Sequence, residues 1–260
     1  MTPNLDPVLG QFDCISLDAL NGKAAMLERL DNKYVVPGDA LRLALETLMP
    51  AFDILEIEGR RAFTYRTRYF DDAGLCAYFD HQRGRRKRCK IRVRDYVDSG
   101  LRYLEVKLKD VRDVTVKKRL RLDPGEHGVS GDSFRFVGTC YRDIYGEDFD
   151  KPLRPVLGMS YERITLVAKE GGERMTIDSN LSFGARNVVC FADPLMSVVE
   201  TKSARGNGLA DKVLRSLHIH PTRACSKYCV GMAATRQVPR CNRFLPALRK
   251  LGLGEAWAAA

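Results

Sequence analysis

In the stretch RKRCKIRVRDY, residues 86–96, basic side chains occupy every second position from Arg88 to Arg94, with small or apolar residues between them. The basic positions are Arg88, Lys90, Arg92 and Arg94. Successive side chains of a β-strand point to opposite faces, so the stretch predicts a strand with one cationic and one apolar face. Like charges in line repel one another, which indicates that an anion binds this face.

Similar alternation recurs along the chain. Further strands are predicted at 28–36, 63–72, 75–82, 102–110, 114–122, 160–168, 174–183 and 197–203. Charged or polar residues share a face within them: Arg29, Asp31 and Lys33; Glu105, Lys107 and Lys109; Lys117, Arg119 and Arg121; Tyr161 and Arg163; Asp178 and Asn180; Glu200 and Lys202. A solvated face explains any one strand, but the recurrence favours a shared cationic surface.

These patterns predict one α+β domain over residues 1–260. We expect about eight antiparallel strands to form a β-barrel whose charged faces line an inner tunnel. Helices predicted at 37–50, at 131–150 and from 208 onward would then cover the outward apolar faces. A short helix is also expected after Ser16, a suitable N-cap.

The composition is compatible with an intracellular protein that binds anions. Of 260 residues, 45% are hydrophobic, and the net charge is +10 with a pI near 9.3. Such a charge favours phosphorylated ligands, nucleic acid or anionic membranes. No apolar run is long enough for a transmembrane helix, and the N-terminus does not resemble a signal peptide, so we expect a cytoplasmic location.

The cysteines do not suggest a disulfide framework. A zinc site could be drawn from His218, His220, Cys225, Cys229 and Cys241, but reduced, partly buried thiols are the simpler interpretation.

The charged residues indicate phosphate chemistry. Arginine binds phosphate through paired hydrogen bonds and lysine binds it as a point charge. The acids Asp31, Glu105 and Glu200 are too few to neutralise the cations, but they suit a divalent metal that shares phosphate oxygens. Phosphoryl transfer needs this combination, and no Walker loop is present. His81 is interpreted as a structural residue or a phosphate contact rather than a base.

A series of short motifs resembles the VTC domain, the polyphosphate polymerase domain of the vacuolar transporter chaperone complex and its bacterial relatives. The motifs are KY (33–34), YFDD (69–72), R-x-K-x-R-x-R-x-Y (88–96), LEVK (104–107), K-x-R (117–119), Y-x-R (161–163), D-x-N (178–180), E-x-K (200–202) and SKY (226–228). They run in order over about 26–232. The domain belongs to the triphosphate tunnel metalloenzymes, or CYTH-like superfamily.

The resemblance implies a tunnel that holds a metal-bound triphosphate and transfers the γ-phosphoryl group of ATP onto polyphosphate, with Mn²⁺ or Mg²⁺ as cofactor. The catalytic residues that it implies are Lys33, Arg92, Arg94, Lys107, Lys117 and Arg163. Further phosphate contacts are Arg88, Lys90, Arg119, Lys202 and Lys227. Glu200 is the expected main metal ligand, with Glu105 as the second.

Two positions depart from the family pattern. The first strand often has Glu-x-Glu-x-Lys, whereas this chain has Arg29-Leu30-Asp31-Asn32-Lys33, which fits the polymerase branch better than the triphosphatase branch. Around SKY, Lys227 is present, but Ala224 stands where a second basic residue is typical.

Other functions stay open. A triphosphatase would need a carboxylate, Glu105 or Asp31, to orient water. A sensor would bind polyphosphate or inositol phosphates without turnover. Nucleic acid is not expected as a partner, because aromatic residues do not interleave with the cations. The expected partners are ATP and inorganic polyphosphate. No SPX-type domain or transmembrane segment is recognised in the sequence, so any attachment to a membrane would need a separate membrane protein as partner. The oligomeric state is left open.

Overall fold

The computed structural model describes residues 5–23, 30–110, 115–123, 125–126 and 128–254. Its eleven strands form one sheet with the main order β2-β11-β9-β8-β4-β5-β6-β7, and neighbours along this path are antiparallel. These strands are β2 (Leu30–Pro37), β4 (Ala62–Asp71), β5 (Arg88–Tyr96), β6 (Leu101–Lys109), β7 (Thr115–Arg121), β8 (Arg154–Ala168), β9 (Arg174–Ala185) and β11 (Met196–Ser203). The predicted α+β class with about eight antiparallel strands is confirmed.

Three short strands complete the sheet. β1 (Asp13–Ile15) pairs in parallel with β3 (Phe52–Leu55), β3 also pairs with β8, and β10 (Val188–Phe191) pairs with β9. The sequence analysis predicts none of the three, because alternation over three or four residues is too short to recognise.

The helices confirm most of the predicted segments. They are α1 (Asp6–Leu9), α2 (Leu17–Lys23), α3 (Gly38–Leu48), α4 (Cys76–Arg83), α5 (Gly131–Tyr145), α6 (Leu209–Ser216), α7 (Lys227–Ala234) and α8 (Leu245–Lys250), with 3-10 turns at Met49–Ala51, Val97–Ser99 and Asn242–Phe244. The Ser16 hydroxyl accepts a hydrogen bond from the Ala19 amide at the start of α2, as its N-cap position predicts.

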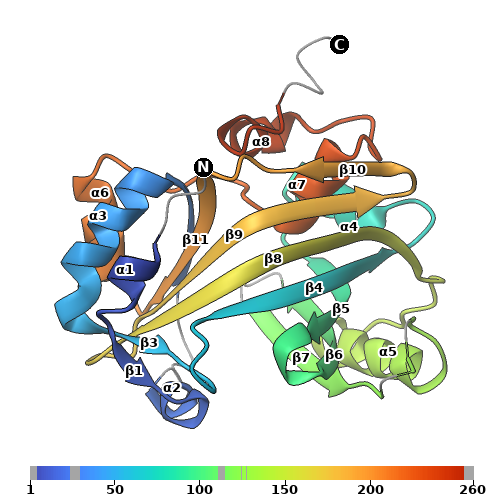
Figure 1. Ribbon diagram of the computed structural model, residues 1–260. Helices are drawn as coiled ribbons and strands as arrows, with labels where there is room; N and C mark the ends of the chain where they lie inside the picture. Colours follow the sequence, from blue (N-terminus) through green and yellow to red (C-terminus); the bar gives the residue numbers. More distant parts are fainter. Residues whose placement is uncertain (1–4, 24–29, 111–114, 124, 127, 255–260) are drawn as a thin grey trace.

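The sheet curls so that one face is concave (Figure 1). On the outer face, α3 and α6 pack against β2, β9 and β11, while α5 packs against the apolar face of β5 and β6. On the inner side, α7, α4 and α8 share a third core with residues of β4, β8 and β9. The helices therefore fill one end of the concavity and leave the charged strand faces around it.

The two ends of the strand path do not meet. In the part of the chain that the structure describes, β2 and β7 do not pair with each other. The predicted barrel is therefore a curled, tunnel-like sheet that is not closed, with β5, β6 and β7 on one side of the concavity and β2 and β11 on the other.

A glycine brings α7 close to the sheet. A Cβ atom built at Gly231 would lie 2.6 Å from side-chain carbons of both Leu157 and Phe183. Since real Cβ atoms do not approach that closely, only glycine allows α7 to pack directly on β8 and β9 at this point. This contact sets how far α7 reaches into the concave side.

The prediction of a strand at 75–82 is wrong, because these residues form α4. The carboxylates just before the helix satisfy its first amides: Asp71 accepts hydrogen bonds from the Ala77 and Tyr78 amides, and Asp72 accepts one from Cys76. Gly84 then ends the helix with a φ of 70°. Capping at both ends outweighs the short apolar pattern.

The prediction that Asp178 and Asn180 share a face is also wrong. The register of β8 and β9 shifts near Asn180, which has a φ of 52°. The side-chain amide of Asn180 donates to Glu162 on the outer face, so Leu181 rather than Asn180 joins the inner core. This β-bulge reverses the alternation within the strand. Arg29 lies outside the described residues.

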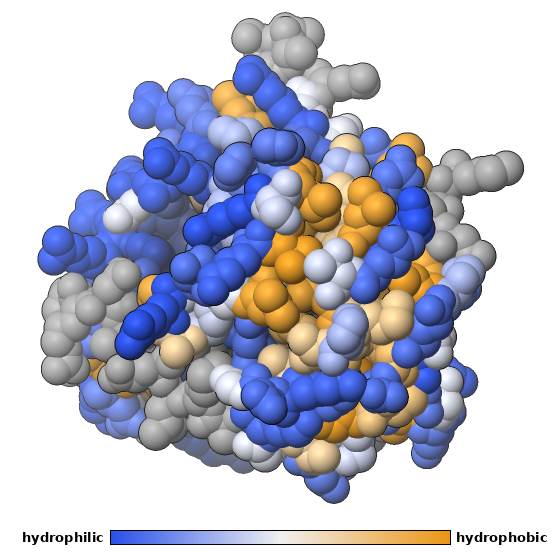
Figure 2. Space-filling model, turned by 90° about the vertical axis from the view of Figure 1, so that its left-hand side faces the viewer, coloured by the Kyte–Doolittle hydropathy of each residue, from blue (hydrophilic) through white to orange (hydrophobic). Residues whose placement is uncertain are grey.

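The side that carries α3 and α6 shows an apolar area surrounded by hydrophilic side chains (Figure 2). Leu43 of α3 and Leu209 of α6 are among the exposed apolar residues. Among the described residues, no helix has the length and apolar character needed to cross a membrane.

Candidate active site

The inner faces of β5, β6 and β7 form a surface that we call the cation wall. Strand register places Lys90, Lys107 and Lys117 directly opposite one another across the three strands. The adjacent row is Arg92, Glu105 and Arg119, and it follows the same register. The alternation that predicted one cationic strand face thus produces a two-dimensional array of cations with a single carboxylate at its centre.

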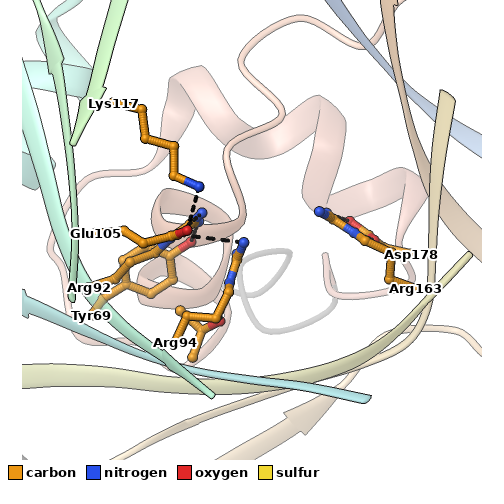
Figure 3. Close-up of polar contacts among 8 residues, drawn as sticks. Tyr69, Arg92, Arg94, Glu105, Lys117, Arg163 and Asp178 are labelled. Carbon is orange, nitrogen blue, oxygen red and sulfur yellow. Dashed lines mark hydrogen bonds and ion pairs between the residues drawn. The ribbon is translucent and has the colours of Figure 1, made fainter. Parts of the chain in front are cut away.

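Glu105 is held by three cations (Figure 3). Its Oε2 accepts a hydrogen bond of 2.7 Å from Nε of Arg92, and Nη1 of Arg94 lies 3.6 Å from the same oxygen. Lys117 forms an ion pair with the other carboxylate oxygen. Burial alone would raise the pKa of Glu105, but these cations outweigh it and hold the pKa well below its usual range. Glu105 is therefore an anion that fixes the positions of its neighbours.

The row of Lys90, Lys107 and Lys117 has fewer carboxylate partners than the arginines around Glu105. Among the described residues, neither Lys90 nor Lys107 forms an ion pair with a carboxylate. Burial, together with neighbouring cations, lowers the pKa of Lys90 to about 7 and also lowers that of Lys107. Burial lowers the pKa of Lys117 to about 8 although Glu105 opposes the shift. An anion that entered here would stabilise the charged form of all three side chains.

The inner faces of β8, β9 and β11, together with Lys227 of α7, form a second surface, which we call the paired wall. Asp178 is fully buried and accepts hydrogen bonds of 2.6 and 2.7 Å from Arg163. Nζ of Lys227 lies 2.6 Å from the same carboxylate. Burial would raise the pKa of Asp178, but the two cations outweigh it and lower the pKa to about 2.

Glu200 completes the paired wall. It forms an ion pair with Lys202, and one of its oxygens lies 3.8 Å from Nζ of Lys33 on the neighbouring strand. Lys202 in turn lies 3.8 Å from Asp31. Burial opposes ionisation of Glu200, yet Lys33 and Lys202 hold its pKa well below the usual range.

Tyrosine rings lie among the cations, which corrects the expectation that aromatic residues do not interleave with them. Tyr65 stacks on Tyr161 with ring centroids 5.3 Å apart. The guanidinium of Arg163 lies 5.1 Å from the Tyr65 ring centroid, and that of Arg94 lies 5.3 Å from it. The faces of these rings hold arginines in place, so the tyrosines orient the cations.

The remaining predicted residues lie at the edges of the site. Arg88 donates to the carbonyl of Arg85 at the α4 end of β5, and Arg119 of β7 lies over the ring of Tyr103 of β6. His81 of α4 shares a hydrogen bond between Nδ1 and the Ala77 carbonyl. Burial and Lys90 lower the pKa of His81 to about 2, so the ring is neutral, as expected of a structural residue rather than a cationic phosphate contact.

Sequence reasoning missed several contributors. Asp178 lies in the D-x-N motif and Tyr69 in the YFDD motif, but the sequence predicts neither that Asp178 anchors the paired wall nor that Tyr65 and Tyr69 contact arginines. Alternation along the predicted strand 63–72 places Tyr65 and Tyr69 on one face, which is the signal that could have identified them. In the structure the hydroxyl of Tyr69 accepts a hydrogen bond from Arg92. Lys227, in contrast, meets Asp178 only because α7 packs inside the curled sheet, which no local pattern encodes.

The carboxylates differ in how well they suit a metal ion. Glu105 is 1% exposed and surrounded by three cations, so a divalent cation beside it would be repelled. Glu200 faces the interior and has Asp31 nearby across Lys202, which leaves it the better oxygen ligand. In the described residues, no group of three or more histidine, cysteine or acidic side chains could hold a metal, the buried Cys225, Cys229 and Cys241 included.

The concave antiparallel sheet with its cationic inner face defines a curled, tunnel-like α+β fold whose interior is suited to anions. A family model described as the VTC domain matches residues 28–236, which is most of the chain. The chain therefore belongs to the VTC domain family, as its ordered motifs predicted. Curated proteins give no match in sequence.

Solved structures give distant similarities. A candidate adenylyl cyclase from Hippeastrum, described as having a dominant triphosphatase activity, is 13% identical with a TM-score of 0.46, and the match covers 84% of this chain and 100% of that one. The PH1819 protein from Pyrococcus horikoshii is 13% identical with a TM-score of 0.42, over 77% and 96% of the two chains. The family assignment rests on the VTC match alone.

Proposed function

We propose that this protein is a metal-dependent polyphosphate polymerase that transfers the γ-phosphoryl group of ATP onto a polyphosphate chain within the concave site. The observation that supports it most is the cation wall. Its opposed rows extend across three strands, so they can neutralise several consecutive phosphates at once, whereas a single phosphate group would leave most of the row uncompensated.

The roles of the residues follow from their surroundings. Lys90, Lys107 and Lys117 would hold phosphates along the row, and Arg92 and Arg94, fixed by Glu105, would present their guanidinium groups to the same chain. Lys33 and Arg163 would hold it from the opposite side. Catalysis of phosphoryl transfer is mostly positioning and charge neutralisation, which such a fixed array provides without a protein nucleophile.

The inner carboxylates favour a polymerase over a hydrolase. Glu105, Asp178 and Glu200 are all paired with cations, and all three have a lowered pKa. Such carboxylates are weak bases, so none of these three is suited to take a proton from an attacking water, and Asp31, the other candidate, lies 3.8 Å from the ammonium group of Lys202. The terminal oxygen of a polyphosphate chain is already an anion and needs no base, so the transfer reaction matches these side chains better.

The family resemblance implies Mn²⁺ or Mg²⁺, and Glu200 is the residue that we assign to it. Magnesium commonly binds one or two protein carboxylates and completes its shell with substrate phosphates, so one glutamate is sufficient. A bound ion would neutralise charge on the phosphate oxygens. For Glu105 we propose a positioning role toward Arg92, Arg94 and Lys117 in place of the predicted second metal site.

The test is incubation of the purified protein with γ-labelled ATP and Mn²⁺, followed by electrophoresis of the products. We expect labelled ladders longer than triphosphate that a polyphosphatase removes. Free orthophosphate without ladders would instead identify a triphosphatase. Tight binding of polyphosphate with neither product would identify a sensor.

A further inference from the structure

α3 and α6 cover one end of the outer face of β8 and β9, but in the described part of the chain no helix lies over these strands between α3 and α5. Figure 1 shows β9, β8 and β4 crossing the front of the molecule between α3 on one side and α5 on the other. Arg66 and Arg68 of β4 point to this outer face, whereas Thr67 between them is buried on the inner face, where Arg94 bonds it. The surface is therefore separated from the concave site by the thickness of the sheet.

Strand register organises this face into a trough. Arg68 lies opposite Gly158, Gly158 opposite Gly184, and Gly184 opposite Val189 of β10. The next row consists of Arg66, Ser160, Ser182 and Phe191, paired in the same way. A hollow of about 470 Å³ lies along these rows. An adjoining hollow of about 270 Å³ begins at Arg68, Gly158 and Gly184 and extends round the end of the sheet to Met232 and Gln237. Glycines and serines thus form a floor between an arginine wall and an apolar wall.

The apolar wall is exposed to an unusual degree. Val189 is 64% exposed and Phe191 is 72% exposed, on a strand that pairs only with β9 in the described part of the chain. Cys190, which points to the opposite face, donates a hydrogen bond to the Ala234 carbonyl of α7. The strand is therefore anchored from behind while its free edge and its outward apolar side chains face solvent. Such edges ordinarily pair with another chain or are protected by charge.

The charge of the trough is positive. Its lining includes Arg66, Arg68, Arg154 and Arg186. Asp95 is the acidic residue in the lining, and it is already paired with Arg102. A ligand that fills the trough must therefore bring negative charge on one side and apolar groups on the other.

We propose that this trough binds an extended acidic segment of a partner protein, with its carboxylates against Arg66 and Arg68 and its apolar side chains against Val189 and Phe191. An extended chain points successive side chains to opposite sides, so a segment that lies over the floor parallel to β8 and β9 meets both walls at once. An anionic membrane is a flat surface and would fit a protruding patch better than a hollow with facing walls. The proposal does not depend on the reaction in the concave site.

The test uses a fluorescent peptide of about eight residues in which glutamate alternates with valine or phenylalanine, the length of an ordinary strand. Binding to the full chain is followed by fluorescence anisotropy. We expect saturable binding that is at least tenfold weaker when serine replaces the apolar residues of the peptide. Saturating tripolyphosphate should leave it unchanged, since that anion is directed to the other face of the sheet.

Two variants test whether the peptide binds in the trough. Arg66→Glu combined with Arg68→Glu should weaken it at least tenfold by reversing the charge of one wall. Gly184→Leu should do the same by filling the floor, because a Cβ there has only ordinary contacts, the nearest at 3.9 Å to Val189. Arg135→Glu on α5, an exposed arginine away from the trough, is the matched control and should have no effect.

Three results would overturn the proposal. One is displacement of the peptide by tripolyphosphate, which would place it in the concave site. Another is equal binding by all variants. The third is binding to phosphatidylserine vesicles with no binding of the peptide, which would identify a membrane surface.

Discussion

The cation wall and the paired wall contain the same types of side chain but balance their charges differently. On the paired wall, Asp178 pairs with both Arg163 and Lys227, and Glu200 pairs with Lys202, so two carboxylates serve three cations. On the cation wall, Glu105 is the shared ion-pair partner of Arg92, Arg94 and Lys117. Lys90 has no carboxylate partner among the described residues. The paired wall is therefore largely compensated by its own carboxylates, whereas the cation wall is left with a much larger excess of positive charge.

Two buried lysines show what this difference means. Burial lowers the pKa of both, but Asp178 reverses the effect at Lys227 and raises its pKa, whereas Lys90 is left with a pKa of about 7. The same residue type is thus a permanent cation on one wall and a titrating group on the other. The paired wall is assembled before any ligand arrives, while the cation wall becomes fully charged when an anion binds.

The largest expected effect concerns the internal compensation of the paired wall. Asp178→Asn leaves Arg163 and Lys227 buried without a counter-charge. Removal of one partner from a buried ion pair costs on the order of 3–5 kcal/mol, so we expect a loss of that size in the free energy of unfolding. Urea denaturation measures it.

Glu162→Gln is the matched control for that experiment. Glu162 is an exposed carboxylate on the outer face of the neighbouring strand, bonded to Asn180. We expect its change to cost less than about 1 kcal/mol. A loss of similar size in both variants would mean that the paired wall is no more tightly compensated than the protein surface.

The second effect concerns turnover. Glu200→Gln should reduce kcat at least ~100-fold because it removes the carboxylate assigned to the metal. It should also lower the thermal unfolding temperature because Lys202 loses its partner, so kcat is compared at a temperature at which both proteins are folded. Product formation is measured at several Mn²⁺ concentrations. Glu105→Gln serves as the comparison, and it should leave the Mn²⁺ requirement unchanged. Activity close to wild type in Glu200→Gln would remove Glu200 from the metal site.

Much of this arrangement could be predicted from local sequence. The alternation within 88–94 and 117–121 fixes which side chains share a face, and register then brings them together without further information. The sequence did not reveal the bulge at Asn180, because one extra residue leaves the composition of the strand unchanged. It also misled at 75–82, where the deciding capping groups are Asp71, the last residue of the preceding strand, and Asp72, which follows it.

The paired wall could not be predicted for a different reason. Its central contact joins Asp178 of β9 to Lys227 of α7, and it exists because Gly231 lets the helix approach Leu157. Nothing in the spacing of these residues encodes that approach. Contacts made between neighbouring strands follow from periodicity, whereas contacts made by a helix that enters the concavity depend on tertiary packing.

The third effect concerns phosphate binding by the cation wall. Arg92→Ala should weaken binding of tripolyphosphate by about 1.5–3 kcal/mol, the usual contribution of a charge-assisted hydrogen bond, which is roughly 10- to 150-fold in Kd. Arg119→Ala should have a smaller effect, because Arg119 is exposed on the end strand of the path. Isothermal titration calorimetry gives both values. Equal effects would mean that fixation by Glu105 gives Arg92 no advantage.

The smallest effect is a change in proton uptake at Lys90. With a pKa of about 7, the free side chain is mostly neutral at pH 8, and a bound phosphate favours the charged form. Anion binding at pH 8 should therefore take up a proton, and the contribution of Lys90 to affinity should be complete below pH 7 and decline as the pH rises above it.

Calorimetry of tripolyphosphate binding in two buffers with different ionisation enthalpies measures the uptake. Lys90→Met should take up roughly one proton less than the wild type, whereas Lys118→Met, on the outer face of β7, should not differ. Identical uptake in all three proteins would show that Lys90 is already compensated and that the two walls do not differ in the way described.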